Sequence, residues 1–506
     1  MKKYIALFLA VLFVLSAVIG CSKPNNDKPS GTTASGDQPG DDTSGEITTA
    51  ADTTPFYIDL DYDGTDILIA CRDEYNNFVI GEDTGDIFFQ SIYDVNQMVE
   101  DHLGVNMEFE FGSKDTAVFI QQTAKLILGN DCPYDIVLPD QFYGSAYIPQ
   151  NAFLDAAHLN TEKNYINLEK DCWYHYYIDN MKINKDQTFF LSGALSPSIL
   201  AWTGCTFVNI KMYNDLFGDT INEFLNDVEA GKWTVDLMRE KCEAAYVDVN
   251  NNSHVDKDDV LGGAVTAGQS AVFASVAAGM KFSRTLADGS IIIAGDEEIS
   301  LKAFEKTHDL YSDTLGFYPF QFTGLTGLLD AQKFADDTCL FVPEYIIYAF
   351  WDDLRNMSSS YVIIPRPKAD EQQEQYISCT QDCFFLYTIP TSTPNDKLEC
   401  ISAVIETMCE LYDEKVMPNM YDISLKVKFA PEEIDQEQTA RLLDIIKNNI
   451  TSDFTVTFTS SINNYPNMVG SYIGGGRDAW SRMFGMQKKS IQLRLDALLE
   501  KLATLK

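Results

Sequence analysis

Val105-Asn106-Met107-Glu108-Phe109-Glu110-Phe111 alternates apolar and polar side chains without a break. This period of two predicts a β-strand with one buried face. The preceding residues 92–103 follow a different period, with apolar side chains at helical spacing: Ile92, Val95, Met98, Val99 and Leu103. Gly104 separates the two patterns. The sequence therefore predicts a helix that ends at a glycine and leads directly into a strand.

The same order of elements is found on both sides of this stretch. Asp66-Ile67-Leu68-Ile69-Ala70 is a β-rich run before the helix, and residues 117–128 form a second helical pattern that stops at Gly129. Tyr134-Asp135-Ile136-Val137-Leu138 then has the composition of a third strand. Strands and helices that alternate at this spacing predict an α/β fold with a parallel sheet.

Later elements are expected along the rest of the chain. They are strands at 206–208, 341–343 and 361–365, and helices at 235–246, 398–412, 436–448 and 490–505. Thr234 suits the N-cap of the helix that follows it. The last helix carries an apolar stripe made of Ile491, Leu495, Leu498, Leu502 and Leu505. Such a stripe can bind a membrane, but we expect it to pack on the protein's own core.

Length and charge narrow the class of protein. The chain has 506 residues, 45% of them hydrophobic, which exceeds one typical core and predicts two lobes or domains. Its formal net charge of -38 repels phosphate backbones, so nucleic-acid binding is excluded as a function. Beyond residue 21, no apolar run of the sequence reaches the length of a membrane-spanning helix.

The N-terminus has the form of a secretory signal. Lys2 and Lys3 precede an apolar run over residues 4–19, and Gly20-Cys21 follows. The end of this segment, 1–21, resembles the lipobox of bacterial lipoproteins. That resemblance implies acylation of Cys21 and attachment to the extracytoplasmic face of the cell membrane. The alternatives are an ordinary signal peptide with a chance cysteine, or an uncleaved anchor.

A polar segment separates this signal from the first predicted strand. Residues 22–55 consist mainly of Ser, Thr, Gly, Pro, Asn and Asp. They have almost nothing to bury, so we expect a flexible linker with a reach of roughly 30 Å.

Cysteine spacing gives no sign of a metal site. The chain has 11 cysteines, and Cys379 and Cys383, for example, are not at metal-ligand spacing. Disulfides can form outside the cell. Apolar surroundings such as Thr338-Cys339-Leu340-Phe341 nevertheless favour buried thiols.

Residues 248–259 match the spacing of an EF-hand calcium loop. The predicted ligands are Asp248, Asn250, Asn252, the carbonyl of His254, Asp256 through water, and Asp259 as the closing carboxylate. Two positions depart from the pattern, because Ser253 replaces the usual glycine and Asp259 replaces a longer glutamate. A closing aspartate resembles dockerin-type loops. The alternative is a polar turn, but the clustered acids repel one another unless a cation such as structural Ca²⁺ neutralises them.

Several segments together resemble the extracellular solute-binding proteins of ATP-binding-cassette (ABC) importers, in the carbohydrate-binding, maltose-binding-protein-like branch. The segments are the strand at 66–70, residues 92–111, Tyr134-Asp135-Ile136-Val137, Asn209, Tyr213-Asn214-Asp215-Leu216-Phe217, Gly231-Lys232-Trp233-Thr234, Ile364-Pro365-Arg366-Pro367-Lys368 and residues 418–425. Each motif is weak alone, and the resemblance lies in their order and spacing.

The resemblance implies a two-lobed, type II periplasmic-binding-protein-like α/β fold with discontinuous lobes joined by hinge strands. We expect residues 56–200 and 343–405 in the N-terminal lobe, and 201–342 and 406–506 in the C-terminal lobe. The expected crossings between lobes lie near 196–202, 340–343 and 398–412.

The resemblance also places ligand contacts in the loops that follow particular strands, in line with the rule that open α/β sheets bind at strand C-terminal ends. The candidates there are Arg72, Asp73, Glu74, Asp140, Gln141, Tyr143, Glu344 and Tyr345. Aromatic rings that can stack on sugar faces add Trp173, Tyr174 and Trp202. The alternative for each tryptophan is a core position.

Together these observations predict a substrate-binding protein that captures a sugar or oligosaccharide and delivers it to ABC permease subunits, without chemistry on the ligand. The sequence has no Gly-x-Ser-x-Gly, His-Glu-x-x-His or phosphate-loop motif. Three alternatives stay open: a binding protein for a peptide or other small solute, a surface enzyme acting on glycans, and an adhesion or sensing module.

Overall fold

The computed structural model describes residues 60–73, 76–81, 87–184, 186–218, 220–265, 270–320, 329–380, 384–420 and 434–505. The signal segment 1–21 with Cys21, the linker 22–55, Glu74 and Cys383 lie outside the described residues. The predictions made for them stay predictions.

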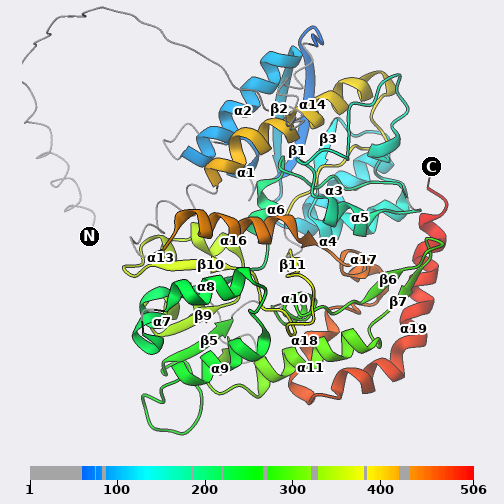
Figure 1. The fold of residues 1–506 in the computed structure, drawn as a ribbon. Coiled ribbons are helices and arrows are strands. Elements are labelled where there is room, and N and C mark those ends of the chain that lie inside the picture. The colour runs from blue at the N-terminus through cyan, green and yellow to red at the C-terminus, as the bar shows by residue number, and fades with distance from the viewer. Residues whose placement is uncertain are drawn as a thin grey trace, which may run out of the picture. The chain divides into compact units, whose positions relative to one another are not determined.

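Three parallel strands form the sheet of the first lobe (Figure 1). They are β1 (Thr65–Arg72), β2 (Val105–Gly112) and β3 (Ile136–Leu138), in the order β2-β1-β3. Helix α2 (Ile87–Leu103) leads into β2, and α3 (Thr116–Leu128) connects β2 to β3. The predicted repeat of strand and helix is therefore confirmed. α2 begins earlier than predicted because Phe88 adds a buried ring to its apolar face.

Five strands form the sheet of the second lobe, in the order β10-β4-β9-β5-β8. They are β4 (Thr206–Asn209), β5 (Leu261–Val265), β8 (Phe317–Pro319), β9 (Cys339–Val342) and β10 (Tyr361–Ile364). β5 is parallel to both of its neighbours, whereas β4 is antiparallel to β9 and β10.

Helix α9 (Val235–Ala245) packs directly on β5. As predicted, Thr234 is its N-cap, because Thr234 Oγ1 accepts a hydrogen bond from the Leu237 amide at 3.3 Å. The close approach of helix and strand requires Gly262, since a Cβ there would lie 2.2 Å from the Cα of Cys242.

The other elements are mostly shorter. The helices are α1 (Asn76–Val79), α4 (Gln141–Gly144), α5 (His175–Met181), α6 (Pro197–Ala201), α7 (Ile210–Phe217), α8 (Ile221–Glu229), α10 (Ser270–Ala277), α11 (Glu298–Ser312), α12 (Leu329–Ala335), α13 (Asp352–Arg355), α14 (Leu398–Leu411), α16 (Gln436–Asn448), α17 (Phe454–Thr457) and α18 (Met468–Tyr472). There are two further strand pairs. β6 (Ser283–Thr285) pairs with β7 (Ile291–Ile293), and β11 (Ser378–Cys379) pairs with β12 (Ile450–Thr451).

The lobe boundaries differ from the expected ones in the second half of the chain. β10, within the segment expected in the first lobe, pairs with β4 in the second sheet. The chain returns to the first lobe only afterwards, where Phe385 and Thr388 form bridges with Asp140 and Val137. α14 packs on α2 and thus stays in the first lobe, whereas a crossing was expected there. Apolar patterns predict that a strand or helix exists, but they do not identify the sheet it joins.

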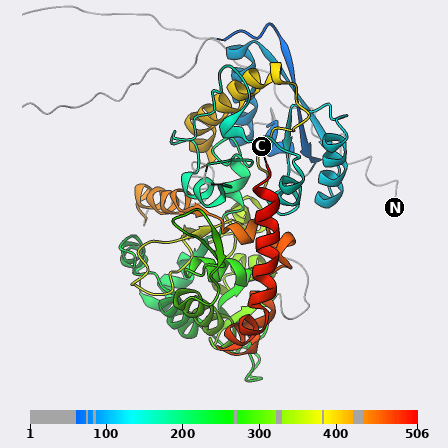
Figure 2. The same cartoon turned by 90° about the vertical axis from the view of Figure 1, so that its right-hand side faces the viewer.

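The C-terminal helix α19 (Ala479–Leu502) contacts both lobes (Figure 2). Near its start, Trp480 Nε1 donates to the Gly295 carbonyl at 2.7 Å, in the second lobe. At its end, the Leu502 carbonyl accepts from Asn184 Nδ2 at 3.1 Å, in the first lobe. The predicted stripe is buried at Ile491, Leu495, Leu498 and Leu502, so its packing on the protein is confirmed. The helix starts earlier than predicted because Trp480, Met483 and Phe484 extend its buried face.

None of the nine described cysteines forms a disulfide with another described residue, and eight of them are buried. The expectation of buried thiols is therefore confirmed for this part of the chain. Among the described residues, no helix has both the length and the apolar character that crossing a bilayer requires.

Candidate ligand-binding site

Three chain segments lie side by side where the chain passes between the lobes. They are residues 203–205, 344–346 and 379–380, which we term the crossing strands. Backbone hydrogen bonds join them: Cys205 N to Glu344 O at 2.9 Å, Ile346 N to Thr203 O at 3.1 Å, and Gly204 N to Cys379 O at 3.0 Å. Two of these segments fall near expected crossings. The arrangement gives both lobes one shared hydrogen-bonded connection.

Arg366 lies buried against the crossing strands. Its Nη2 donates to the Glu344 carbonyl at 3.1 Å, and its guanidinium lies 5.5 Å from the centre of the Tyr345 ring. A Cβ on Gly204 would lie 2.7 Å from Arg366 Nε, so glycine is required for this close approach. Arg366 therefore holds the second crossing strand against the first.

The structure brings together three of the predicted ligand residues at the ends of β1 and β3. Arg72 Nη2 lies 3.7 Å from Asp140 Oδ1, and Arg72 Nη1 also donates to Thr116. Gln141 accepts a hydrogen bond from the Tyr177 hydroxyl of α5. All three predicted residues are buried. We term Arg72, Asp140 and Gln141 the strand-end cluster. Its contact with a ligand stays a prediction.

Two other predicted residues of this region face solvent. Tyr143 is 41% exposed, and its ring packs edge-on against Phe142. The carboxylate of Asp73 lies 3.2 Å from Lys114 Nζ. Both residues are thus accessible to a ligand without any rearrangement of the core.

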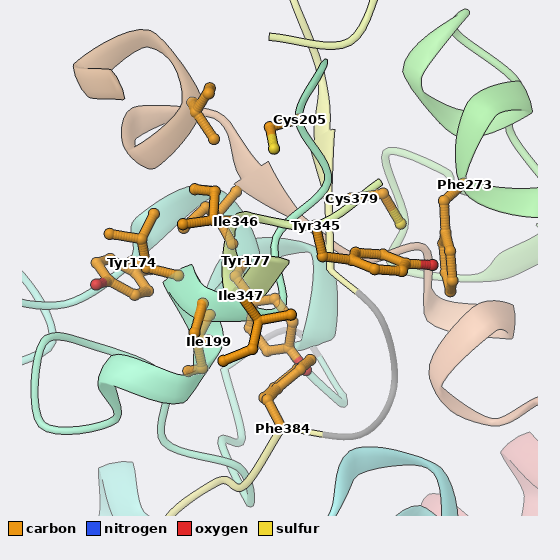
Figure 3. Close-up of a cluster of buried hydrophobic side chains, with 14 of the residues drawn as sticks. Tyr174, Tyr177, Ile199, Cys205, Phe273, Tyr345, Ile346, Ile347, Cys379 and Phe384 are labelled. Atoms are coloured by element: carbon orange, nitrogen blue, oxygen red, sulfur yellow. The ribbon is translucent and has the colours of Figure 1, made fainter. Parts of the chain in front are cut away.

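Trp202 follows α6 and lies beside the crossing strands. Its ring is partly exposed and lies 6.0 Å from the ring of Tyr345. Tyr345 is itself buried and continues the aromatic contact to Phe273 at 6.1 Å. Figure 3 shows that Tyr345 and Phe273 belong to the same buried region as Tyr177 and Phe384. The sequence expectation that Trp202 lies near a crossing agrees with this position. Glu344, next to Tyr345, is also buried.

Trp173 and Tyr174 occupy core positions in the first lobe. Trp173 Nε1 donates to Glu406 Oε2 at 3.3 Å, and the Asn167 amide donates to the same oxygen at 3.0 Å. Lys170 Nζ lies 3.1 Å from the other carboxylate oxygen of Glu406. Burial raises the pKa of Glu406. In this arrangement Trp173 holds the segment before α5 on α14, which is the core alternative considered for it.

A cavity of about 750 Å³ lies beside this region, with walls from both lobes. Its volume is within the range of small-ligand sites. The first lobe contributes α5 and the residues after it, and the second contributes the β6–β7 hairpin, the end of α10 and the start of α17. The polar and charged side chains that line it include Tyr176, Asp179, Asn180, Lys182, Lys281, Arg284 and Asp453. We term this space the interlobe cavity.

The interlobe cavity is linked to the strand-end cluster through α5. Tyr177 contacts Gln141, whereas its neighbour Tyr176 is 36% exposed and lines the cavity. Asn180, one turn further, lines the cavity and donates to Thr451 Oγ1 at 3.1 Å. Tyr176 belongs to the aromatic run that contains Trp173 and Tyr174, but it was not among the predicted ligand residues. The density of aromatic residues was the one feature of the sequence that pointed to this segment, because no local pattern predicts that α5 packs against β12.

In the predicted calcium loop, the side chains of Asn250 and Asn252 meet at Asp256. Ser253, at the position of the usual glycine, has φ +63°. Asn250 and Asn252 both direct their side-chain amides to Asp256 Oδ2, at 2.9 and 2.6 Å. Hydrogen bonds from Asn250, from the Asp258 amide and from Asn252 lower the pKa of Asp256. Rotation of either amide by half a turn would present its oxygen to the same point.

The remaining predicted calcium ligands form hydrogen bonds within the loop or with Tyr246, which precedes it. Asp248 Oδ2 accepts from the Ser253 amide at 2.9 Å, and the His254 carbonyl accepts from the Tyr246 hydroxyl at 3.3 Å. Asp259 is fully buried and accepts from the same hydroxyl at 3.1 Å. The donor set is oxygen-rich and thus fits Ca²⁺.

A second acidic cluster joins His308, Asp309 and Asp313. Arg477 Nε lies 2.7 Å from Asp309 Oδ1, and its Nη2 donates to Asp309 Oδ2 at 2.9 Å. His308 Nδ1 lies 2.5 Å from the Ile473 carbonyl. An arginine already neutralises this carboxylate, so the cluster serves to fasten the loop around Arg477.

Solved structures of other proteins share this architecture. The chain is similar to M. tuberculosis UspC, with a TM-score of 0.52 and 12% identity, over 86% of this chain and 100% of that one. It is also similar to a cyclo/maltodextrin-binding protein complexed with maltotetraose, with a TM-score of 0.53 and 9% identity, over 88% and 98% of the two chains. No protein-family model and no curated protein sequence matches the chain. The predicted two-lobed, periplasmic-binding-protein-like α/β fold is therefore confirmed.

The positions of the two tryptophans give a stability prediction. Trp173→Phe removes the indole donor from a buried carboxylate, so we expect the free energy of unfolding to fall by about 1–3 kcal/mol. Trp202→Phe is the matched control, because Trp202 is partly exposed and its indole has no hydrogen-bond partner among the described residues. The measurement is denaturant unfolding of both variants. Equal losses would contradict the assignment of Trp173 to the core network.

Proposed function

We propose that this chain is a substrate-binding protein that captures a sugar or oligosaccharide between its lobes and delivers it to the permease of an ABC importer. The observation that carries the proposal is the interlobe cavity, whose walls come from both lobes. The crossing strands connect those lobes. A ligand that contacts both walls is bound more tightly when they approach, so binding energy favours closure.

The cavity offers the groups that a sugar requires. Tyr176 presents an exposed aromatic ring, on which the apolar face of a sugar ring can stack. Asn180 and Thr451 supply an amide and a hydroxyl that both line the cavity and lie 3.1 Å from each other. Sugar hydroxyls can replace this direct contact with hydrogen bonds to both groups. The similar cyclo/maltodextrin-binding protein, complexed with maltotetraose, supports a carbohydrate as the ligand.

The direct test is calorimetric titration with a panel of oligosaccharides, using the wild type, Tyr176→Ala and a control. Loss of the stacking ring is expected to weaken binding by about tenfold or more, with little change in melting temperature because the ring is exposed. Tyr93→Ala is the matched control, since Tyr93 is 42% exposed on α2 and does not line the cavity.

Other results would replace the proposal. Binding of a peptide or another small solute, with no carbohydrate bound, would favour the first alternative. Release of a cleaved product from a bound glycan would favour the enzyme. Equal binding by wild type and Tyr176→Ala would contradict the role of the cavity.

We propose in addition that residues 248–259 bind a structural Ca²⁺. Asp248, Asn250, Asn252, His254, Asp256 and Asp259 would hold it, and the ion would offset the repulsion between the acids. A ligand that binds only the folded state raises its stability. Chelation is therefore expected to lower the melting temperature, and Asp248→Ala should abolish that sensitivity. Identical melting of the wild type with and without chelator would identify the loop as a polar turn.

We also propose that Cys21 carries a lipid that holds the protein at the extracytoplasmic face of the membrane. The signal-like residues 1–21 and the polar linker support this attachment. Cys21→Ala is expected to release the protein into the medium or to leave an unprocessed precursor, as seen by cell fractionation and mass spectrometry. Membrane retention of normally processed variant protein would count against the anchor.

A further inference from the structure

The charge of the interlobe cavity differs from that of the chain as a whole. Acidic residues outnumber lysine and arginine by 75 to 37 in the sequence. Around the cavity the balance is reversed, because Lys182, Lys281 and Arg284 line it against Asp179 and Asp453. Cations that outnumber acids in the lining of one cavity, in a protein with a net charge of -38, favour an anionic ligand there.

Both acids of the cavity wall already have partners. Asp453 Oδ2 accepts from the backbone amides of Phe282 and Ser283, at 3.0 and 2.9 Å. Its Oδ1 accepts from the Ser283 hydroxyl at 2.7 Å and from the Thr455 amide at 2.8 Å. Asp179 lies 2.7 Å from Lys182 Nζ. Asp179 is thus paired within the first lobe, and the oxygens of Asp453 are held by neutral donors, so neither carboxylate forms an ion pair with Lys281 or Arg284.

The remaining cations have unused donors. Lys281 is exposed and forms no ion pair with any described residue. Its backbone is fixed, because Lys281 N donates to Ser300 Oγ at 3.1 Å and Lys281 O accepts from the same hydroxyl at 2.9 Å. Arg284 pairs with Glu297 through Nε alone, at 2.9 Å, and its other nitrogens have no partner among the described residues. A guanidinium has donors on all three nitrogens, so those of Arg284 can still receive an anion.

We infer that the ligand of the interlobe cavity is an acidic oligosaccharide whose carboxylate groups are bound by Lys281 and Arg284. The inference rests on the proposed function and deepens it, since it names the class of sugar. Ion pairs with a partly enclosed carboxylate are stronger than those at an open surface. Lys182, on the first-lobe wall, is already paired with Asp179, so the two cations available to the ligand are Lys281 and Arg284 of the second lobe.

The experiment compares tetragalacturonate with maltotetraose, which is neutral and has the same number of sugar rings. Calorimetric titration of the full mature chain is carried out at low and at physiological ionic strength. We expect tetragalacturonate to bind at least about tenfold more tightly, and its affinity alone to fall as salt is added. Lys281→Gln and Arg284→Gln should each weaken tetragalacturonate binding by about tenfold and leave the melting temperature unchanged.

Lys125→Gln is the matched control, because Lys125 is exposed on α3, outside the cavity, and also lacks an ion pair with any described residue. Equal or tighter binding of maltotetraose would overturn the inference and leave the proposed function standing. An equal effect of Lys125→Gln and Lys281→Gln would also overturn it, because the charge effect would then be nonspecific. Failure of both sugars to bind, alongside binding of a peptide or another solute, would contradict the proposed function as well.

Discussion

The hydrogen bonds among the crossing strands are the constraint on which the rest of the structure depends. Through them residues 203–205 contact both 344–346 and 379–380, so these passages of the chain between the lobes are joined to one another. Arg366 packs against these strands. It lies so close to Gly204 that a larger residue would not fit at position 204. A rotation of one lobe about this connection would leave its hydrogen bonds in place. Such motion changes the width of the interlobe cavity while each sheet stays intact.

Buried polar groups near the crossing strands hold α5 and the segment before it in place. Arg72 and Asp140 form a buried ion pair, and Gln141 is bound to Tyr177 of α5. On the other side of α5, Trp173, Asn167 and Lys170 all contact the buried carboxylate of Glu406. Tyr177 thus anchors α5 to the strand-end cluster, and Glu406 anchors the segment just before the helix. The exposed residues of the same helix, Tyr176 and Asn180, face the cavity in defined positions, as a pre-organised site requires.

Local patterns of the sequence predicted much of the first lobe. The alternation at 105–111 and the helical spacing at 117–128 have short-range causes, and the structure reproduces both. The rule for strand ends also predicted that Arg72, Asp140 and Gln141 come together. It could not predict that they are buried, because their surroundings include distant parts of the chain, such as Tyr177, which contacts Gln141. For the same reason the segment that contains β10 was expected in the first lobe, and Lys281 was not considered. The partner of a strand and the walls of a cavity are set by long-range packing, which no local pattern encodes.

The central claim is that the two lobes approach one another on a bound carbohydrate. Small-angle X-ray scattering of the full mature chain, with and without a saturating concentration of the best-bound oligosaccharide, measures this directly. The account predicts a smaller radius of gyration in the bound state, and a shift of this change to about tenfold higher ligand concentration in Tyr176→Ala. An identical scattering profile with and without a ligand that calorimetry shows to be bound would contradict it.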